Sequence, residues 1–343
     1  METKIQKEFI DHGFGFPVKI RDVTMVKVRG VWTPKVDYQV LAQRLLMVLA
    51  VKSGRLTGVE VRFCQARARY TGTVDFRQYA AQSDDRLELL TGALLVARDA
   101  YPGLDFDAQE EKLDELAAPL RRRHIDELPA ALQARALGDH LFIRNGFRGN
   151  AENYYDTRNS FLNDVLERKT GIPISLTVLF VEVARRAGVR ARGVGFPGHF
   201  LARVDDSEGS VIVDPFAGGA TLSRRDLVEL LKRVAGKMKF QEAMLEPTPN
   251  RHIVARMLMN LRGVYAAQGD YPRLLLVLDR LIDLMPDVTD ELRDHGYLCA
   301  KLGAPRAAIE HLQRYLGVLP NAGDVAEVRK FLAKLEQESA RGN

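Results

Sequence analysis

The stretch GVGFPGHFLARVDDSEGSVIVDPFAGG, residues 193–219, decides the fold. Two apolar runs flank the turn-forming residues 205–209, a pattern typical of a β-hairpin. If the loop consists of residues 205–208, His199 lies directly opposite Asp214 on the neighbouring strand. Side chains opposed in this way have Cβ atoms about 5 Å apart. The sequence therefore predicts that an imidazole contacts a carboxylate, and this prediction depends on the register of the two strands.

Both faces of the predicted hairpin are apolar, so we expect other elements to cover both. The apolar residues are Leu201 and Ile212 on one face, and Phe200, Ala202, Val204, Val211 and Val213 on the other. A buried, ionised Asp214 needs a partner, and His199 is sufficient. Two interpretations remain open: a carboxylate that orients the histidine of a nucleophile–His–Asp triad, or a buried pair that joins two strands.

A helix is predicted to begin at Pro173, because proline is favoured in the first helical turn and apolar residues follow at helical spacing. A reactive thiol is best placed at such a helix start, where the helix dipole lowers the pKa of a cysteine. The first turn, GIPISLT (171–177), contains no cysteine, and Cys64 and Cys299 lie in unrelated segments.

Ser175 carries the hydroxyl nearest to this helix start. A serine is a weak nucleophile unless a base removes its proton during the attack. One hypothesis is therefore a hydrolase or acyltransferase with Ser175, His199 and Asp214 as catalytic residues. The alternative is that the Ser175 hydroxyl caps the helix.

The composition is that of an ordinary soluble protein of two or three domains, with 343 residues, 46% apolar and 28% charged. No run of 18 apolar residues and no signal-peptide pattern occurs, so we expect no membrane association. Two isolated cysteines fit a reducing, cytoplasmic compartment and lack the spacing of a zinc site. The sequence predicts no metal and no cofactor.

An internal repeat occupies the C-terminal third. Gly269 recurs as Gly303 and Pro286 as Pro320, each after 34 residues, which is the period of the tetratricopeptide repeat. Residues of the sizes that this repeat requires stand at Tyr265, Gly296 and Ala308. A polar segment, 323–340, is predicted to be a capping helix. Such arrays usually bind proteins.

The middle of the chain alternates predicted helices with the hairpin. The helices are expected near 87–100, 108–122, 129–143, 160–170, 173–187 and from 223 onward. Asn159 or Ser160 is expected to cap the fourth of these helices, and Ser223 and Asp226 have the spacing of a capping box.

Four motifs carry a family resemblance: YYDTRNSFLNDVLER (154–168), GIPISL (171–176), GVGFPGHF (193–200) and DPF (214–216). Together they resemble the SirB-type family, in which a transglutaminase-like domain precedes tetratricopeptide repeats. A related module occurs in an animal F-box protein. The resemblance covers roughly residues 76–340.

The resemblance implies an α+β, papain-like core in which a helix packs on a small antiparallel sheet. In active transglutaminases a cysteine opens that helix, and histidine and aspartate come from successive strands. His199 and Asp214 match the latter two positions. The cysteine position falls at or near Pro173 to Ser175, where the sequence departs from the pattern. The resemblance therefore implies a cleft without thioester chemistry, as in a pseudoenzyme.

Polar residues of the first motif are candidates for the lining of that cleft. Arg158, Asn159 and Asn163 could bind substrate, with amide donors directed at a peptide carbonyl. Helix capping by Asn159 and local turn formation by Arg158 are the alternatives.

The N-terminal part is basic, since residues 1–80 contain 14 Lys and Arg against 7 Asp and Glu. The run 23–31 is β-like and 37–51 is helical in pattern. Residues 15–63 partly resemble the region before the helix-turn-helix of antitoxin-like regulators. The charge permits contact with nucleic acid, although a scattered, solvated basic surface explains it as well.

We expect three parts: a basic α/β segment (1–75), a transglutaminase-like domain (76–248) and all-α tetratricopeptide repeats with a capping helix (249–343). The favoured function is a non-catalytic regulatory protein that binds a polypeptide through its cleft and repeats. The serine hydrolase and a transcription-linked regulator that contacts nucleic acid are the alternatives.

Overall fold

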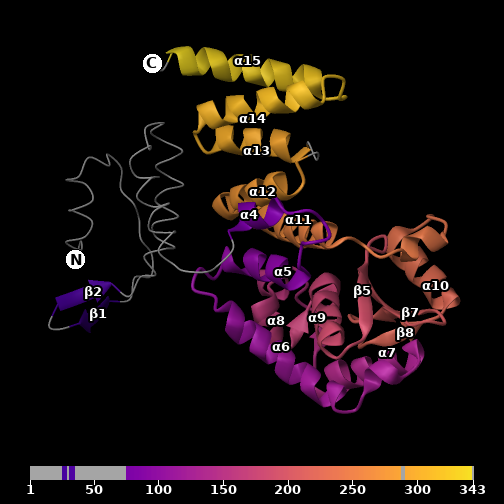
Figure 1. The fold of residues 1–343 in the computed structure, drawn as a ribbon. Coiled ribbons are helices and arrows are strands. Elements are labelled where there is room, and N and C mark those ends of the chain that lie inside the picture. The colour runs from indigo at the N-terminus through magenta and orange to yellow at the C-terminus, as the bar shows by residue number, and fades with distance from the viewer. Residues whose placement is uncertain (1–24, 29–30, 35–74, 287–289, 342–343) are drawn as a thin grey trace. The chain divides into compact units, whose positions relative to one another are not determined.

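The computed structural model describes residues 25–28, 31–34, 75–286 and 290–341 (Figure 1). The chain divides into two units, residues 1–49 and 50–343. In the first unit, β1 (Met25–Val28) and β2 (Val31–Pro34) form an antiparallel pair, so the predicted β-like run, 23–31, contains β1 and ends where β2 begins. The predicted helix over 37–51 and Cys64 lie outside the described residues.

A group of helices precedes a sheet in the second unit. They are α4 (Phe76–Ala80), α5 (Leu89–Arg98), α6 (Phe106–Arg121), α7 (Ala130–Gly138), α8 (Leu162–Arg168) and α9 (Pro173–Arg186). The central helix is α9, whose residues from Pro173 to Ala184 are all buried. Its predicted start at Pro173 is confirmed.

The sheet consists of β5 (Arg190–Val194), β6 (Leu201–Asp205), β7 (Ser210–Asp214) and β8 (Ala220–Leu222), antiparallel and in that order. One face packs into the main core with α9, and the other packs against α10 (Arg224–Ala235). The prediction that both faces of the hairpin are covered is confirmed. Ser223 and Asp226 form the expected capping box of α10.

The predicted register of the hairpin is wrong by two residues. The structure pairs Asp205 with Ser210 and Ala202 with Val213, so the loop is 206–209. The Asp206 side chain determines this loop, because its Oδ1 accepts hydrogen bonds from the backbone N–H groups of residues 208 and 209, each at 2.8 Å. A displacement of two residues leaves alternate side chains on the same faces of the sheet.

Two helix predictions need correction. The expected helix over 129–143 ends at Gly138 and continues as a π-helical turn, Asp139–Arg144. The expected cap of α8 by Asn159 or Ser160 is wrong, since the N-cap is Phe161 and no side chain caps it. A short parallel bridge, β3 (Arg148–Gly149) with β4 (Thr170–Gly171), joins this region to the start of α9.

The C-terminal part is a series of antiparallel helices (Figure 1). They are α11 (Asn250–Gln268), α12 (Tyr271–Leu284), α13 (Asp290–Lys301), α14 (Pro305–Val318) and α15 (Val325–Arg341). The small-residue position at Gly296 is confirmed, because a Cβ there would lie 2.6 Å from Leu312. The predicted capping helix is α15.

The repeats and the α+β core share packing contacts. Helix α4 lies against α12, and α5 against α11. Arg280 of α12 forms a two-pronged ion pair with Asp99, with both N–O distances 2.9 Å, and its guanidinium stacks on Phe76. The core therefore continues into the repeats. The predicted α+β class with a C-terminal helical array is confirmed.

Candidate functional site

The His199–Asp214 pair forms despite the register error. His199 Nε2 lies 3.0 Å from Asp214 Oδ2, and the histidine side chain is 10% exposed. The other oxygen of Asp214, Oδ1, accepts hydrogen bonds from the backbone N–H groups of Phe216 at 3.0 Å and Ala217 at 3.2 Å. Asp214 is thus held as an acceptor, which favours a proton on Nε2 of the imidazole.

The other ring nitrogen of His199, Nδ1, has no hydrogen-bond partner within the described ranges. The structure thus contains the histidine and aspartate that a triad would need. A nucleophile would have to come from the start of α9.

The hydroxyl of Ser175 is buried and engaged by the backbone. Its Oγ donates to the carbonyl of Asn159 at 2.5 Å and accepts from the N–H of Ile172 at 3.1 Å. The residue is fully buried. This side chain belongs to the N-terminal capping arrangement of α9, and its hydrogen bonds do not include His199.

Asn159 fixes the loop that carries the first sequence motif. Its Nδ2 donates to the carbonyls of Asn153 at 2.8 Å and Tyr154 at 3.3 Å, and its Oδ1 accepts from Asn150 at 3.1 Å. Asn159 has no exposed surface. The Asn159 amide, predicted to donate to a peptide carbonyl, therefore donates to carbonyls of the chain itself.

The side chains of the other two predicted binding residues, Arg158 and Asn163, form none of the hydrogen bonds of Asn159. Arg158 is 55% exposed and pairs with Asp156, with an N–O distance of 2.7 Å. The guanidinium of Arg158, by its hydrogen bonds, lowers the pKa of Asp156 below the usual range. Asn163 has a buried Oδ1 with no hydrogen-bond partner among the described residues.

An aromatic strip, defined here as Tyr155, Tyr154, Phe216 and His199, runs outward from the His–Asp pair. Neighbouring rings meet edge to face with centroid distances of 5.4, 6.3 and 6.0 Å. Tyr155 is 72% exposed and Tyr154 38%. The strip therefore leads from a polar pair to an exposed aromatic surface.

Gly149 allows this arrangement, because a Cβ there would lie 2.6 Å from the Phe216 ring. The sequence motifs contain Tyr154, Tyr155 and Phe216, but these residues were not predicted to belong to the site. The available signal was three asparagines, 150, 153 and 159, around two adjacent tyrosines. Asparagines commonly fix turns through side-chain bonds to the backbone.

These features define a class of protein: a transglutaminase-like domain followed by tetratricopeptide repeats. Residues 107–259 match the family model of the transglutaminase-like superfamily, and residues 261–333 match that of the tetratricopeptide repeat.

The chain belongs to the UPF0162 family. It is 39% identical over 264 residues to a UPF0162 protein of Xylella fastidiosa, which covers 76% of this chain and 94% of that protein. A UPF0162 protein of Vibrio cholerae is 28% identical over 239 residues, covering 69% and 88% of the two chains. F-box only protein 21 of Mus musculus is 28% identical over 241 residues, covering 67% of this chain and 36% of that protein. No solved structure matches.

The comparisons support the predicted combination of a transglutaminase-like domain with tetratricopeptide repeats, in relatives named UPF0162. They give no support to the predicted helix-turn-helix likeness of residues 15–63, which lie largely outside the described residues. Among the helices that the structure describes, none combines the length and apolar character needed to span a bilayer.

Proposed function

We propose that this protein is a non-catalytic transglutaminase-like protein that binds a polypeptide through its aromatic strip and its repeats. The observation that carries the proposal is the engagement of Ser175, whose hydroxyl bonds to the Asn159 carbonyl at 2.5 Å in a fully buried position. A nucleophile must reach the substrate, and this hydroxyl is used to hold a loop.

The environment of the helix start supports the same proposal. The first-turn residues Pro173, Ile174 and Ser175 are all buried, and none is a cysteine. His199 and Asp214 then orient the end of the sheet and the aromatic strip. An imidazole in this position can form hydrogen bonds with a bound polypeptide without a covalent step.

The aromatic strip supports polypeptide binding in particular. Tyrosines combine a large apolar surface with a hydroxyl and lose little side-chain entropy on binding, so they are enriched at protein interfaces. The Asn159 network holds the carbonyls of Asn153 and Tyr154, so the loop is ordered before a ligand arrives. The tetratricopeptide region supplies a second surface of a type that commonly binds proteins.

The test begins with peptides selected from a random display library against the full chain. Their affinity is then measured for the wild type, for Tyr155→Ala, and for Met238→Ala, a control that removes an apolar side chain of 50% exposure elsewhere on the surface. We expect Tyr155→Ala to weaken binding about tenfold and Met238→Ala to leave it unchanged. Equal affinities of all three proteins would contradict the strip as the binding surface.

The non-catalytic part is tested by the mass of the bound peptide after prolonged incubation. We expect an unchanged mass. Cleavage, deamidation or acyl transfer that disappears in His199→Ala would overturn the proposal and favour the hydrolase or acyltransferase.

A further inference from the structure

The first turns of α11 adjoin the segment that carries His199. Two residues before the helix, the backbone N–H of Thr248 donates to the carbonyl of Gly193 at 2.8 Å. Within the helix, Ile253 approaches the same segment, because a Cβ at Gly193 would lie 2.8 Å from Ile253 and 2.9 Å from the ring of Phe200. Helix α11 is therefore fixed beside the inner end of the aromatic strip.

Arg256, about one turn further along α11, has no acceptor for its guanidinium. The other two arginines of the helix are paired, Arg251 with Asp84 at 2.5 Å and Arg262 with Glu291 at 3.4 Å. The side chain of Arg256 is half-buried and forms no ion pair or hydrogen bond with the residues that the structure describes. Each of its guanidinium nitrogens retains accessible surface, so a ligand can reach them. A partly buried cation is stabilised by an anionic partner, and a guanidinium offers only donors.

This cation lies close to the tyrosines of the strip. Burial and the neighbouring Tyr155 raise the pKa of Tyr154, and the positive charge of Arg256 opposes that shift. Both rings are exposed. Asp156, the acidic residue that follows them, is already paired with Arg158 at 2.7 Å. Exposed aromatic rings and an unpaired guanidinium are therefore neighbours on an accessible surface.

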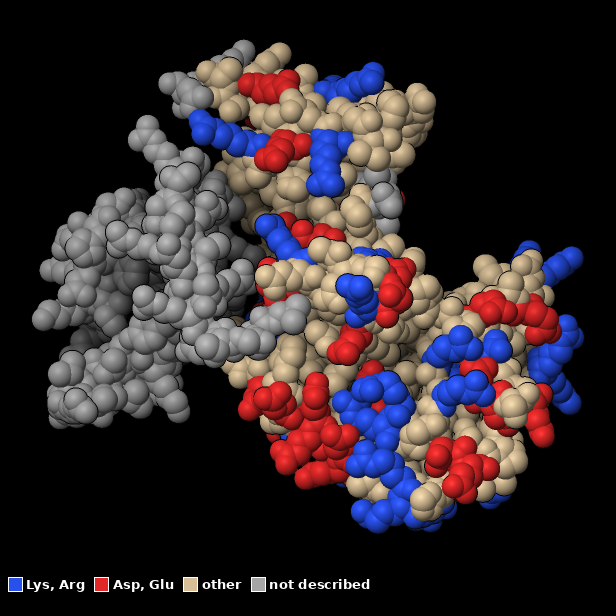
Figure 2. All heavy atoms as spheres, viewed as in Figure 1, with Lys and Arg blue, Asp and Glu red and all other residues tan. Residues whose placement is uncertain are grey.

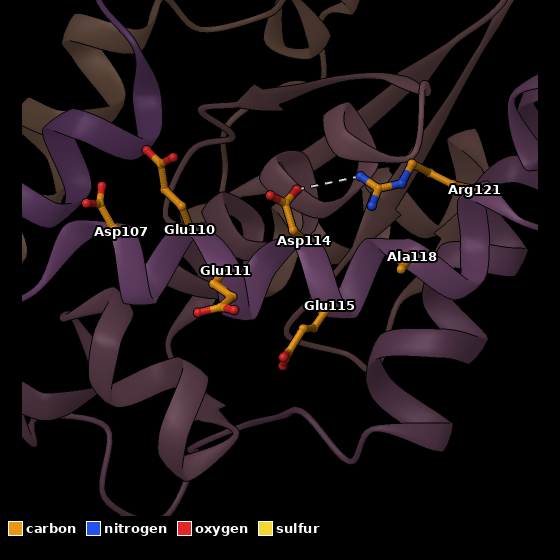
Figure 3. A pocket seen from close by; sticks show the side chains of 7 residues that line it. All are labelled: Asp107, Glu110, Glu111, Asp114, Glu115, Ala118 and Arg121. Carbon is orange, nitrogen blue, oxygen red and sulfur yellow. Dashed lines mark ion pairs between the residues drawn. The ribbon is translucent and has the colours of Figure 1, made fainter.

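The surface of α6 has the opposite charge. A hollow with a volume of about 560 Å³ lies there, and its lining side chains all project from this one helix (Figure 3). Figure 2 shows acidic residues gathered over this part of the surface. Like charges repel, so an acidic peptide is kept from α6, whereas a basic peptide is attracted to it. The lining residues are Asp107, Glu110, Glu111, Asp114, Glu115, Ala118 and Arg121.

We propose that the aromatic strip and Arg256 together bind a polypeptide segment in which an apolar side chain stands near a carboxylate. The apolar side chain packs on the exposed ring of Tyr155, and the carboxylate accepts hydrogen bonds from the guanidinium of Arg256, whose planar donors match both carboxylate oxygens. This inference rests on the function proposed above and adds the charge of the ligand. Either an Asp or Glu side chain or the end of a chain supplies such a carboxylate, and the test separates these two sources.

The test uses peptides selected against the full chain from a random display library whose members end in a free carboxylate. The tightest peptide is synthesised as selected, as its C-terminal amide, and with each acidic side chain replaced in turn by the matching amide. We expect one of these neutralisations to weaken binding to the wild type about three- to tenfold, and the one that does so identifies the source of the carboxylate. Binding that no neutralisation weakens would overturn the inference.

Arg256→Gln locates the partner of that carboxylate. We expect the variant to bind the selected peptide about three- to tenfold more weakly than the wild type, and to bind the neutralised peptide equally well, because the carboxylate then has no partner to lose. A neutralisation that weakens binding to both proteins by the same factor would contradict the pair with Arg256. Since the Arg256 side chain forms no hydrogen bond with the described residues, the variant should melt at the wild-type temperature.

Arg306→Gln is the matched control. Arg306 is exposed on α14, beyond α12 and α13 in the series of helices, forms no ion pair with the described residues, and its replacement changes the net charge equally. Neutralising the peptide should weaken binding to this variant as much as to the wild type. If Arg306→Gln abolishes the difference as well, overall charge is responsible and the inference fails. Tyr155→Ala separates the two proposals: peptides that need Tyr155 but no carboxylate would overturn this inference alone, whereas peptides that do not need Tyr155 would overturn the function proposed for the strip as well.

Discussion

The Ser175 hydroxyl joins the start of α9 to the backbone carbonyl of Asn159, with an Oγ–O distance of 2.5 Å. Asn159 in turn holds the carbonyl of Tyr154 through its side-chain amide. A continuous set of hydrogen bonds therefore runs from the first turn of α9 to the loop of the exposed tyrosines. In this chain the helix start supports a surface loop.

Ser175→Ala should lower the free energy of unfolding by about 2 kcal/mol, because the carbonyl of Asn159 and the N–H of Ile172 both lose a partner in a buried place. Urea unfolding followed by circular dichroism measures this. Thr177→Val is the control, since Thr177 is equally buried but the one side-chain hydrogen bond that it forms with the described residues is long, 3.5 Å to the Phe200 carbonyl. An equal loss in both variants would argue against a special role of the Ser175 hydroxyl.

Asn159→Leu should release the tyrosine loop, since three hydrogen bonds to that loop depend on the Asn159 side chain. We expect amide hydrogen exchange over residues 150–158 to rise at least about tenfold, which corresponds to a loss of about 1.4 kcal/mol in local stability. Asn163→Leu is the matched control, because the Asn163 Oδ1 has no partner to lose. Unchanged exchange in Asn159→Leu would show that the loop is held by other contacts.

The hairpin shows how much the sequence could predict. Alternating apolar residues correctly identified the two faces of β6 and β7, because the side-chain period of a strand does not depend on its loop. The first apolar run, 193–204, is however not one strand: it contains the end of β5, a segment without strand structure at 195–200, and most of β6. The register was not predictable in the same way. It depends on Asp206, whose side chain bonds to two N–H groups of the loop and to Ala130, a residue 76 positions earlier. The His199–Asp214 contact still forms, although His199 lies in the bend before β6 and outside the paired residues.

The roles of the polar residues in the first motif, 154–168, could not be predicted from the sequence. Their types and spacing are compatible with ligand binding and with structural capping, and no local pattern separates the two. The distinction comes from tertiary packing: Asn159 is fully buried among its own carbonyls, whereas Arg158 is exposed beside Asp156. The aromatic strip likewise joins Tyr154, in the loop before α8, to Phe216, two residues after β7, although the sequence separates them by 62 positions.

Asp214→Ala should lower the free energy of unfolding by about 1–3 kcal/mol, because the imidazole of His199 and the N–H groups of Phe216 and Ala217 lose their acceptor. Differential scanning calorimetry measures the change. Asp85→Ala is the control, since Asp85 is exposed and its carboxylate forms no ion pair with the residues that the structure describes. A melting temperature identical to that of the wild type would contradict the buried pair.

Two histidines form a cluster in the repeats, where three successive helices contact one another. His295 of α13 bonds through Nε2 to Asp279 of α12 at 2.9 Å and through Nδ1 to Cys299 at 3.4 Å. The ring of His311 from α14 stacks on it, with a centroid distance of 3.9 Å. Burial opposes the charge on His295, but the bonds to Asp279 and Cys299 outweigh it and raise its pKa to about 9. Burial, together with the positive His295, lowers the pKa of His311 to about 4.

The pH dependence of stability should therefore have a maximum near pH 6.5, the ordinary pKa of histidine. The folded chain binds a proton at His295 more tightly than the unfolded chain, so this contribution is complete below about pH 6.5 and is lost as the pH rises through about 9. His311 has the opposite sign: its contribution is lost as the pH falls from about 6.5 towards about 4.

Urea unfolding between pH 4 and 9 measures both the acidic and the alkaline limb of this stability profile. His295→Gln should flatten the alkaline limb and His311→Gln the acidic limb, whereas the exposed His252→Gln should change neither. An alkaline limb that is as steep in His295→Gln as in the wild type would rule out this cluster as its origin.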